Sequence, residues 1–318
     1  MLGFAVGDAL GAPLAGLPPV CDSRRLPPIT GFTTNLDHPY FGHLGRGCYT
    51  ENTRLLLDAA RDYSDRACFD RDLRTRTLVH WAQRIEADPE SARWPGETTL
   101  QGARQLASGT SSRAVSRDSV GAVYRCLPIA VIAAADTTRY SMVAAEVALT
   151  HSHPDCVTGA ALLVDIARHI LVAQPPVRAM QMGLDRRRRL EGRTPLLDRC
   201  QAAIESDPGD ADLRSRWGTG AGCMETIPLS LAILTHLAAS PTEALLYAAN
   251  CGKPGHSGAW DKDTAQRNGG NSDGIAALVG ALLGAAFGAE AILTAWPDVE
   301  NARLIVNHAT TLGQHFIP

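Results

Sequence analysis

Apolar residues recur at intervals of three and four along most of this chain, the spacing that places them on one face of an α-helix. The pattern predicts helices at residues 53–63, 120–135, 141–150, 157–172, 224–238, 242–249 and 275–287. No alternating β-branched run of strand length competes with them. Alanine and other small residues in these segments allow close helix packing, so the sequence predicts an all-α fold, one compact multi-helix domain over residues 1–318.

Two stretches rich in glycine or proline interrupt the helical pattern. Residues 16–47 and 249–271 show little hydrophobic period, and long structureless loops inside a compact domain are often functional. A basic run at residues 185–189 has acids nearby, which is typical of a solvated helix face, and a phosphate contact is the alternative. The two long stretches are therefore candidate functional loops.

Composition narrows the classes of partner. The chain is 45% hydrophobic and 20% charged with a net charge of -3, so no basic surplus indicates binding to nucleic acid or to an anionic membrane. The eight cysteines have no CxxC spacing, which predicts reduced, mostly buried thiols. No signal peptide and no membrane helix of about 18 apolar residues is recognised. We expect a cytoplasmic protein with a small or mildly polar ligand, and the scarcity of lysine beside arginine indicates a GC-rich bacterial genome.

Two segments near the N-terminus contain side chains suited to chemistry. Residues 3–13 start a helix with small residues, and Asp8 within it fits a helix cap or an acid behind a site. Within residues 49–53, Thr50, Glu51 and Asn52 bring oxygen atoms to a helix start, where they can converge on a hard divalent cation. Helix capping by Thr50, with Glu51 favouring the helix dipole, is the alternative interpretation.

Two further segments follow along the chain. Residues 120–129 contain small residues that let backbone N–H groups approach a ligand. Shortly afterwards, His151 and His153 are two residues apart, a weak metal signal beside a capping or hydrogen-bonding role. Residues 269–277 form a glycine-rich loop that carries Asn271 and Asp273 into the next helix.

In this order the segments resemble the motifs of the ADP-ribosylglycohydrolase family, of the dinitrogenase reductase-activating glycohydrolase type, across almost the whole chain. Residues 50–53 are similar to its Thr-Asp-Asp-Thr metal motif, and residues 269–274 to its Gly-Gly-Asp-Thr-Asp-Thr motif. The resemblance implies the family's all-α fold and an ADP-ribosyl or nucleotide substrate, small or protein-linked. The implied magnesium (Mg2+) ligands are Thr50, Glu51, Asn52, Asn271 and Asp273. The implied substrate contacts are Gly121, Ala122, Tyr124, Arg125, His151, His153, Gly269, Gly270 and Ser272, with a structural ion pair as the alternative for Arg125.

The sequence departs from the family pattern where the metals would bind. The positions that differ are Ala15, Asn52, Val120, Tyr124, Asn271 and Gly274. Four family acids are thereby reduced to Glu51 and Asp273, too few to offset the charge of two adjacent divalent ions. An apparent insertion at residues 253–268 contains the spacing Asp-x-Asp-Thr at 261–264, which offers substitute acids. We expect one weakly bound magnesium ion or none rather than two.

Three functions fit these residues. In the first, a hydrolase, Glu51 and Asp273 flank the anomeric carbon of a ribosyl N- or O-glycosidic bond, and one carboxylate activates water. In the second, the protein is a catalytically inactive binder of ADP-ribose. In the third, the pocket serves an enzyme acting on a nucleotide-derived intermediate of a specialised bacterial pathway. The hydrolase comes first because the glycine loops and two acids remain.

Overall fold

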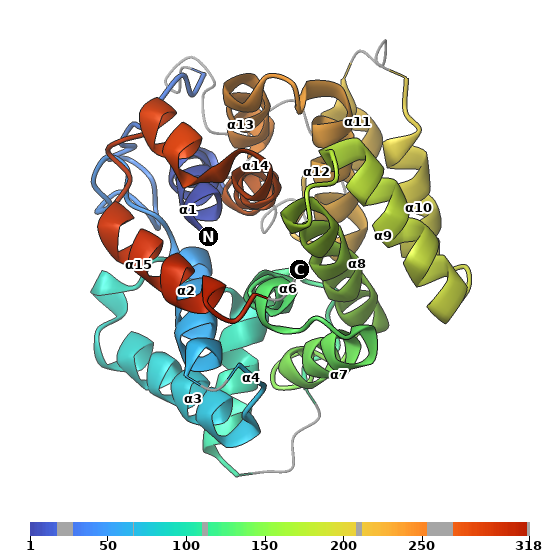
Figure 1. Ribbon diagram of the computed structural model, residues 1–318. Helices are drawn as coiled ribbons and strands as arrows, with labels where there is room; N and C mark the ends of the chain where they lie inside the picture. The colour runs from blue at the N-terminus through green and yellow to red at the C-terminus, as the bar shows by residue number, and fades with distance from the viewer. Residues whose placement is uncertain (18–27, 66, 110–113, 208–211, 253–269, 317–318) are drawn as a thin grey trace.

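The computed structural model describes residues 1–17, 28–65, 67–109, 114–207, 212–252 and 270–316, a part of the chain that contains no β-strand (Figure 1). The all-α prediction is confirmed. The α-helices are α1 (Leu2–Gly11), α2 (Glu51–Ser64), α3 (Arg71–Ala87), α4 (Glu97–Ala107), α5 (Gly121–Cys126), α6 (Ile129–Ile132), α7 (Asp136–Val147), α8 (Pro154–Leu171), α9 (Pro176–Glu191), α10 (Pro195–Ile204), α11 (Leu213–Trp217), α12 (Cys223–Leu237), α13 (Pro241–Ala249), α14 (Ser272–Ala295) and α15 (Ala302–Gly313). Short 3-10 helices are η1 (Ala12–Leu14), η2 (Pro89–Ser91) and η3 (Asn250–Gly252).

Local sequence signals mark where several helices begin. The Asp70 side chain accepts a hydrogen bond from the Leu73 N–H at 3.0 Å and caps α3. Thr194 caps α10 in the same way. Proline stands in the first turn of α8, α9, α10 and α13, where its missing N–H costs no intrahelical hydrogen bond. These starts follow from the sequence without help from distant contacts.

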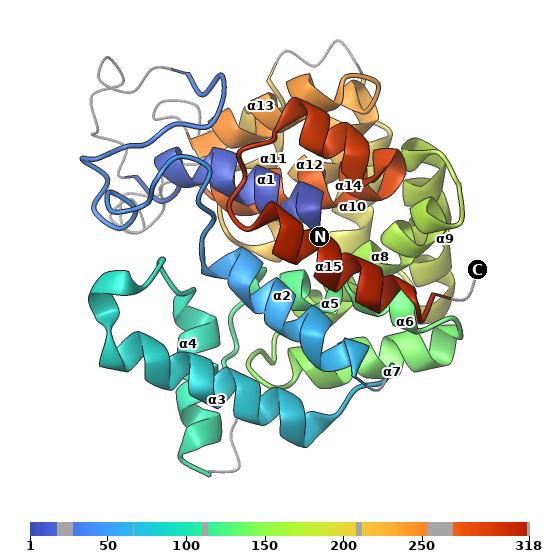
Figure 2. The ribbon, with the colours of Figure 1, turned by 60° about the vertical axis from the view of Figure 1, so that its left-hand side comes forward.

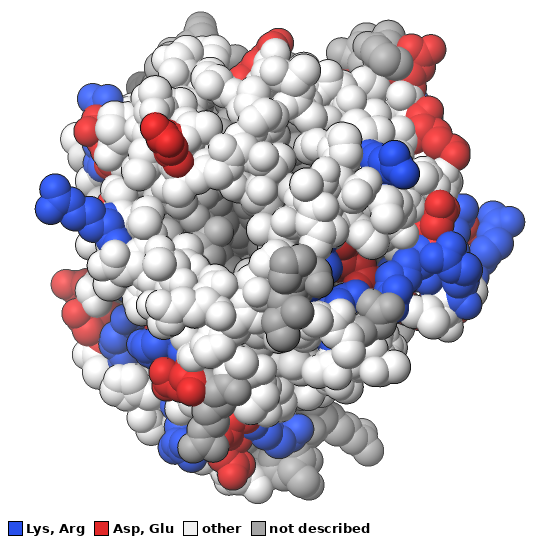
Figure 3. Space-filling model, in the orientation of Figure 1, with Lys and Arg blue, Asp and Glu red and all other residues white. Residues whose placement is uncertain are grey.

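The sequence pattern misplaces or misses other elements. The predicted helix at 120–135 is broken into α5 and α6 at Pro128, whose ring and missing N–H interrupt a helix. The pattern does not predict α3, α4, α9, α10 or α15, and in α3 and α9 many charged residues interrupt the apolar spacing. Basic side chains gather beside α9 on the right of Figure 3. Within the 185–189 run, however, Arg187 is buried and pairs with Asp165 at 2.8 Å, so this helix face is not wholly solvated.

Helices α1 and α14 lie side by side near the centre of the molecule (Figure 1). Gly3, Gly7 and Gly11 recur every four residues along α1, and a Cβ added to any of them would overlap the backbone of α14. Only glycine permits this separation of the two backbones. The contact fixes the start of α14, which carries Asp273, beside the end of α1.

Helix α14 is longer than the pattern predicted. It continues past residue 287 to Ala295, with non-helical backbone angles at Gly288 (φ 82°, ψ 171°). By length and composition it qualifies as a membrane span, so the expectation of no such helix is corrected. Half of its most apolar window is nevertheless buried inside the protein, where α14 packs on α1, α12 and α13.

Two groups of helices flank this central pair. Helices α8, α9, α10 and α12 pack on one another on one side, and α2, α3, α4 and α15 lie on the other (Figures 1 and 2). Three loop segments are joined by backbone hydrogen bonds, from Val120 N to Ala221 O at 3.1 Å and from Asn271 N to Thr219 O at 2.6 Å. The motif segments, distant in sequence, therefore meet at one place.

Candidate functional site

A cavity of about 480 Å³ opens where these loops meet. We call it the motif pocket. Its lining residues are Ala15, Gly16, Phe41, Asn52, Trp94, Gly96, Glu97, Thr98, Thr99, Arg117, Asp118, Ser119, Val120, Gly121, Tyr124, Gly220, Ala221, Gly222, Glu225, Gly270, Asn271 and Asp273. Six residues predicted from the sequence are among them: Asn52, Gly121, Tyr124, Gly270, Asn271 and Asp273.

Asp273 is the buried carboxylate among the described residues that line this pocket. The Asn52 side-chain amide donates a hydrogen bond to Asp273 Oδ2 at 3.0 Å, which joins the start of α2 to the start of α14. Burial raises the pKa of Asp273 to about 6, against hydrogen bonds from the backbone N–H groups of Gly274 and Asp273 itself. A carboxylate with such a pKa can accept a proton near neutral pH.

Asn271 connects Tyr124 and Thr226 across the same region. Its Nδ2 atom lies 3.1 Å from the Tyr124 hydroxyl oxygen and 2.9 Å from Thr226 Oγ1. The Thr226 hydroxyl donates in turn to the Gly220 carbonyl at 2.7 Å. We call Asn52, Tyr124, Asn271 and Asp273 the polar cluster, because these four side chains line the pocket and form two hydrogen-bonded pairs, Asn52 with Asp273 and Asn271 with Tyr124.

Asp8 lies behind the polar cluster, fully buried on α1. Its Oδ2 accepts hydrogen bonds from the N–H groups of Thr50 and Thr53, at 3.2 and 3.0 Å, and from the Thr53 hydroxyl at 2.5 Å. Burial raises the pKa of Asp8 to about 7, and the charge of Asp273 adds to the rise. Asp8 thus holds the start of α2, and its Oδ1 has no hydrogen-bond partner among the described residues.

Glu51 is not brought together with Asp273, contrary to the expected pairing of these acids across a substrate. Its carboxylate is buried and accepts hydrogen bonds from Trp81 Nε1 at 2.9 Å, from Arg54 at 2.8 Å and from Arg84 at 3.2 Å. It does not line the motif pocket. Neighbouring Thr50 caps α2 by accepting from the Asn52 N–H at 3.2 Å.

Arg125 and His151 lie behind one wall of the pocket. Arg125 is fully buried, pairs with Glu146 at 2.8 Å and donates to Thr150 Oγ1, which matches the structural alternative of an ion pair. His151 is hydrogen-bonded between Thr150 and Ser119, through Nδ1 at 2.8 Å and Nε2 at 2.9 Å. Burial, with the charge of Arg125, lowers the pKa of His151 to about 3, so the ring is neutral. Of the residues in this hydrogen-bonded row, Ser119 is the one that lines the pocket.

The other predicted contacts are placed outside the pocket lining. Ala122 is fully buried, and the Ser272 hydroxyl donates to the Gly11 carbonyl in the contact between α1 and α14. His153 caps α8 by accepting from the Asp155 N–H at 3.3 Å. Gly269 and the insertion at 253–268, with its Asp-x-Asp-Thr spacing, lie outside the described residues.

Sequence reasoning missed the aromatic residues of the pocket. Trp94 and Phe41 line it with their ring centroids 5.5 Å apart, and the partly exposed Tyr40 ring lies 4.1 Å from that of Trp94. A Cβ on Gly16 would overlap the Trp94 ring, so this close approach requires the glycine. The sequence signal is weak, because these aromatic residues lie in two loops about fifty residues apart.

Sequence reasoning also missed the loop at residues 218–222. Glu225 at the start of α12 accepts a hydrogen bond from the Gly220 N–H at 2.8 Å. Gly218 has a positive φ of 80°, which favours glycine. The loop lines the pocket through Gly220, Ala221 and Gly222. Its Gly-x-Gly-Ala-Gly pattern was the available signal.

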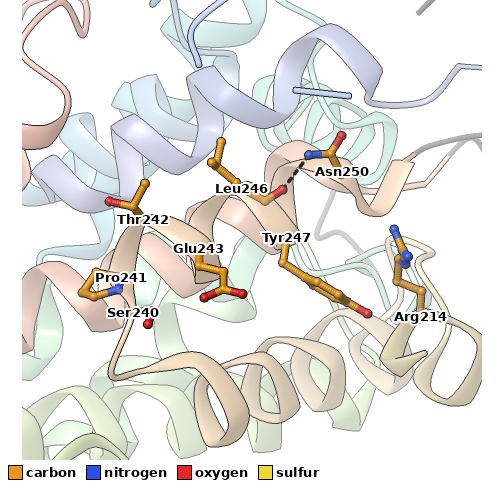
Figure 4. A pocket seen from close by; sticks show the side chains of 8 residues that line it. All are labelled: Arg214, Ser240, Pro241, Thr242, Glu243, Leu246, Tyr247 and Asn250. Carbon is orange, nitrogen blue, oxygen red and sulfur yellow. Dashed lines mark hydrogen bonds between the residues drawn. The ribbon is translucent and has the colours of Figure 1, made fainter. Parts of the chain in front are cut away.

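A second cavity, of about 600 Å³, lies on α11 and α13 and shares no lining residue with the motif pocket (Figure 4). Its lining combines polar and apolar side chains, and Arg214 lies over the Tyr247 ring. None of the predicted site residues lines it. We therefore take the smaller motif pocket as the candidate site.

Metal ligands are sparse in the part of the chain that the structure describes. No three His, Cys, Asp or Glu side chains there are grouped to hold a metal ion. The polar cluster offers one carboxylate and two neutral amides. The seven described cysteines are free, and five of them are buried.

Comparison with known proteins gives three similarities. The model of the ADP-ribosylglycohydrolase family matches residues 1–259. An uncharacterized protein of Archaeoglobus fulgidus is 26% identical over 294 residues, 90% of this chain and 85% of that protein. A solved structure of an ADP-ribosylglycohydrolase-related protein complex matches with a TM-score of 0.69 and 20% identity, covering 99% of this chain and 96% of that chain. The family match ends before Asn271 and Asp273, whereas the structural match extends across both.

Proposed function

This chain belongs to the ADP-ribosylglycohydrolase family, and from that premise we propose that it hydrolyses a ribosyl N- or O-glycosidic bond of an ADP-ribosyl or related nucleotide substrate. The family supports a glycosylhydrolase-type function. The observation that carries the proposal is Asp273, a buried carboxylate that lines the motif pocket and is oriented by Asn52. The substrate is a small molecule or is linked to a protein.

The side chains that line the motif pocket suit such a substrate. Trp94 and Phe41 supply aromatic faces on which a nucleotide base can stack. The aromatic rings therefore favour the base, and the polar cluster favours the ribose.

The residues that the structure describes do not fit the paired magnesium ions of the family motifs. The amide nitrogen of Asn52 donates to Asp273. The amide nitrogen of Asn271 donates to Tyr124 and Thr226. Two divalent ions would need several carboxylates to offset their charge, and the polar cluster supplies one. We propose that the reaction proceeds without a paired-metal centre.

In this reaction Asp273 acts as the general base. Its carboxylate takes a proton from a water molecule, whose oxygen forms a bond to the anomeric carbon of the ribose. The glycosidic bond breaks, and its electron pair leaves with the departing group. Asn52 keeps the Asp273 carboxylate oriented toward the pocket during this step.

A non-catalytic ADP-ribose binder is the second candidate function. The observation that favours it is the same hydrogen bond from Asn52, because a carboxylate oxygen engaged by an amide is less available to activate water. In either function we propose a cytoplasmic location, in keeping with the free, mostly buried thiols.

Asp273→Asn tests the hydrolase directly. We expect turnover of ADP-ribosylated arginine and serine peptides, followed as free ADP-ribose by chromatography in the presence of EDTA, to fall by about 10²- to 10⁴-fold, the usual contribution of a general base. The thermal midpoint should stay near that of the parent protein, because the substitution keeps the side-chain volume.

The matched control is Asp298→Asn, which changes a carboxylate with a side chain 67% exposed. It should leave turnover unchanged. Binding of ADP-ribose without turnover in the parent protein would support the binder instead. Neither turnover nor binding would overturn both candidate functions.

A further inference from the structure

The hydroxyl of Tyr124 occupies the space beside Gly274 at the start of α14. A Cβ added to Gly274 would overlap the Tyr124 hydroxyl oxygen and would lie 2.5 Å from Asn271 Nδ2. No side chain at position 274 is therefore compatible with the present position of Tyr124. The two residues, 150 positions apart in sequence, form a matched pair beside the motif pocket, which Tyr124 lines.

The hydrogen-bond network sets the direction of the Tyr124 hydroxyl. Thr226 spends its one hydroxyl hydrogen on the Gly220 carbonyl, so Thr226 Oγ1 must accept the hydrogen bond from Asn271. This assigns the Asn271 amide nitrogen, rather than its oxygen, to the side that faces Thr226. The same nitrogen lies 3.1 Å from the Tyr124 hydroxyl oxygen, which therefore accepts as well.

The hydrogen of the Tyr124 hydroxyl is consequently left for another partner. None of the described residues accepts it, and Tyr124 lines the motif pocket beside Asp273 and Asn52. Burial raises the pKa of Tyr124 well above its ordinary value, and the charge of Asp273 adds to this. The hydroxyl keeps its proton at neutral pH and is a hydrogen-bond donor.

We propose that Tyr124 donates this hydrogen to an oxygen of the ribosyl group, and that Gly274 is required because it leaves room for the donor. The inference rests on the proposed function. A ribose offers ring and hydroxyl oxygens as acceptors, and a buried neutral donor binds them without a metal ion. Tyr124 thereby selects substrates with an acceptor oxygen at this point of the pocket.

A purely structural role for Tyr124 is the alternative. Its ring packs edge-to-face on Phe4 with the centroids 5.4 Å apart, which explains the aromatic side chain but not the direction of the hydroxyl. Tyr124→Phe keeps the ring and removes the hydroxyl, which is both the free donor and the acceptor of the hydrogen bond from Asn271. Calorimetric titration with ADP-ribose in EDTA should show a dissociation constant raised about tenfold, the usual effect of one lost hydrogen bond.

Gly274→Ala should weaken ADP-ribose binding by a similar factor, because its methyl group displaces the hydroxyl. In the Tyr124→Phe background, Gly274→Ala should raise the dissociation constant by a smaller factor than it does in the parent protein, since no donor remains to be displaced. Tyr247→Phe is the matched control, because that hydroxyl lies at the second cavity, and it should leave the dissociation constant unchanged.

An unchanged dissociation constant in Tyr124→Phe would overturn this inference and leave the proposed function standing. Strictly additive effects of the substitutions at 124 and 274 would overturn the pairing of the two residues. If the parent protein neither binds ADP-ribose nor turns over the ADP-ribosylated peptides, the proposed function is overturned, and this inference with it.

Discussion

The two acids singled out by the motifs have different surroundings. Glu51 accepts hydrogen bonds from Trp81 on α3 and from two arginines, and it is fully engaged inside the protein. Asp273 accepts from Asn52 and lines the motif pocket. The Glu51 carboxylate thus joins α2 to α3, whereas the Asp273 carboxylate lines the pocket.

Glu51→Gln should lower the stability of the fold. The glutamine oxygen can still accept one hydrogen bond, but the charge that Arg54 and Arg84 pair with is lost. We expect the free energy of unfolding, measured by urea denaturation, to fall by about 1–3 kcal/mol.

The control for this change is Glu86→Gln, which removes an acid whose partner Arg104 is also exposed. Exposed ion pairs contribute little to stability, so this substitution should change the free energy of unfolding by less than about 1 kcal/mol. Equal effects of the two substitutions would mean that Glu51 does not hold α2 and α3 together.

At the scale of elements, the contact between α1 and α14 positions the site. The glycines of α1 bring the two backbones together, and Asp8, on the same helix, binds the N–H groups at the start of α2. The starts of α2 and α14 are thereby held close enough for Asn52 to reach Asp273. Close packing of small residues thus determines the geometry of the polar cluster.

Gly7→Ala tests this packing. The added methyl group would overlap the backbone of α14 at Ala276 and force the helices apart. We expect the free energy of unfolding to fall by about 1–3 kcal/mol or more. Gly313→Ala, in α15, is the control, because nothing lies within 4 Å of its added Cβ. If Gly7→Ala proves as stable as that control, the close contact does not support the fold.

At the scale of the whole molecule, a buried charge cluster connects helices from different parts of the chain. Glu146 on α7 pairs with Arg74 on α3 at 3.0 Å and with Arg125 on α5 at 2.8 Å. It also accepts a hydrogen bond from Tyr63 on α2 at 2.9 Å. Burial alone would raise the pKa of Glu146, but the two arginines lower it to about 2.

This cluster predicts loss of stability in acid. Because the pKa of Glu146 is lower in the folded protein, its contribution is complete above the ordinary value of 4.5 and is lost as the pH falls through about 2. The full contribution is about 3 kcal/mol. Asp8 and Asp273 have raised pKa values, so between about pH 7 and 4 they increase the stability of the fold as the pH falls.

The measurement is therefore made below that range. We expect the free energy of unfolding by urea to decrease steadily from about pH 4.5 to about pH 2.5. His151, whose pKa burial lowers to about 3, acts in the same direction. A constant free energy over this interval would mean that Glu146 is not held ionised in the folded protein.

Much of the fold follows from local sequence. Apolar spacing predicts the core helices, as in α8 and α12, and proline or capping residues mark many helix starts. The charged helices α3 and α9 do not show that spacing, because part of their polar surface is buried in ion pairs with other helices, as Arg74 and Arg187 are. Apolar periodicity indicates which helix face is buried, but it does not reveal buried ion pairs.

By itself the sequence determined the helical class, the family and the presence of Asp273 among glycine-rich segments, because these depend on residue type and order. Only the tertiary structure decided that Glu51 turns to Trp81, that Asn52 meets Asp273 and that Tyr124 fills the space beside Gly274. Each of these contacts joins residues from different helices, far apart in sequence. Their geometry depends on how closely the helices pack, which no local pattern encodes.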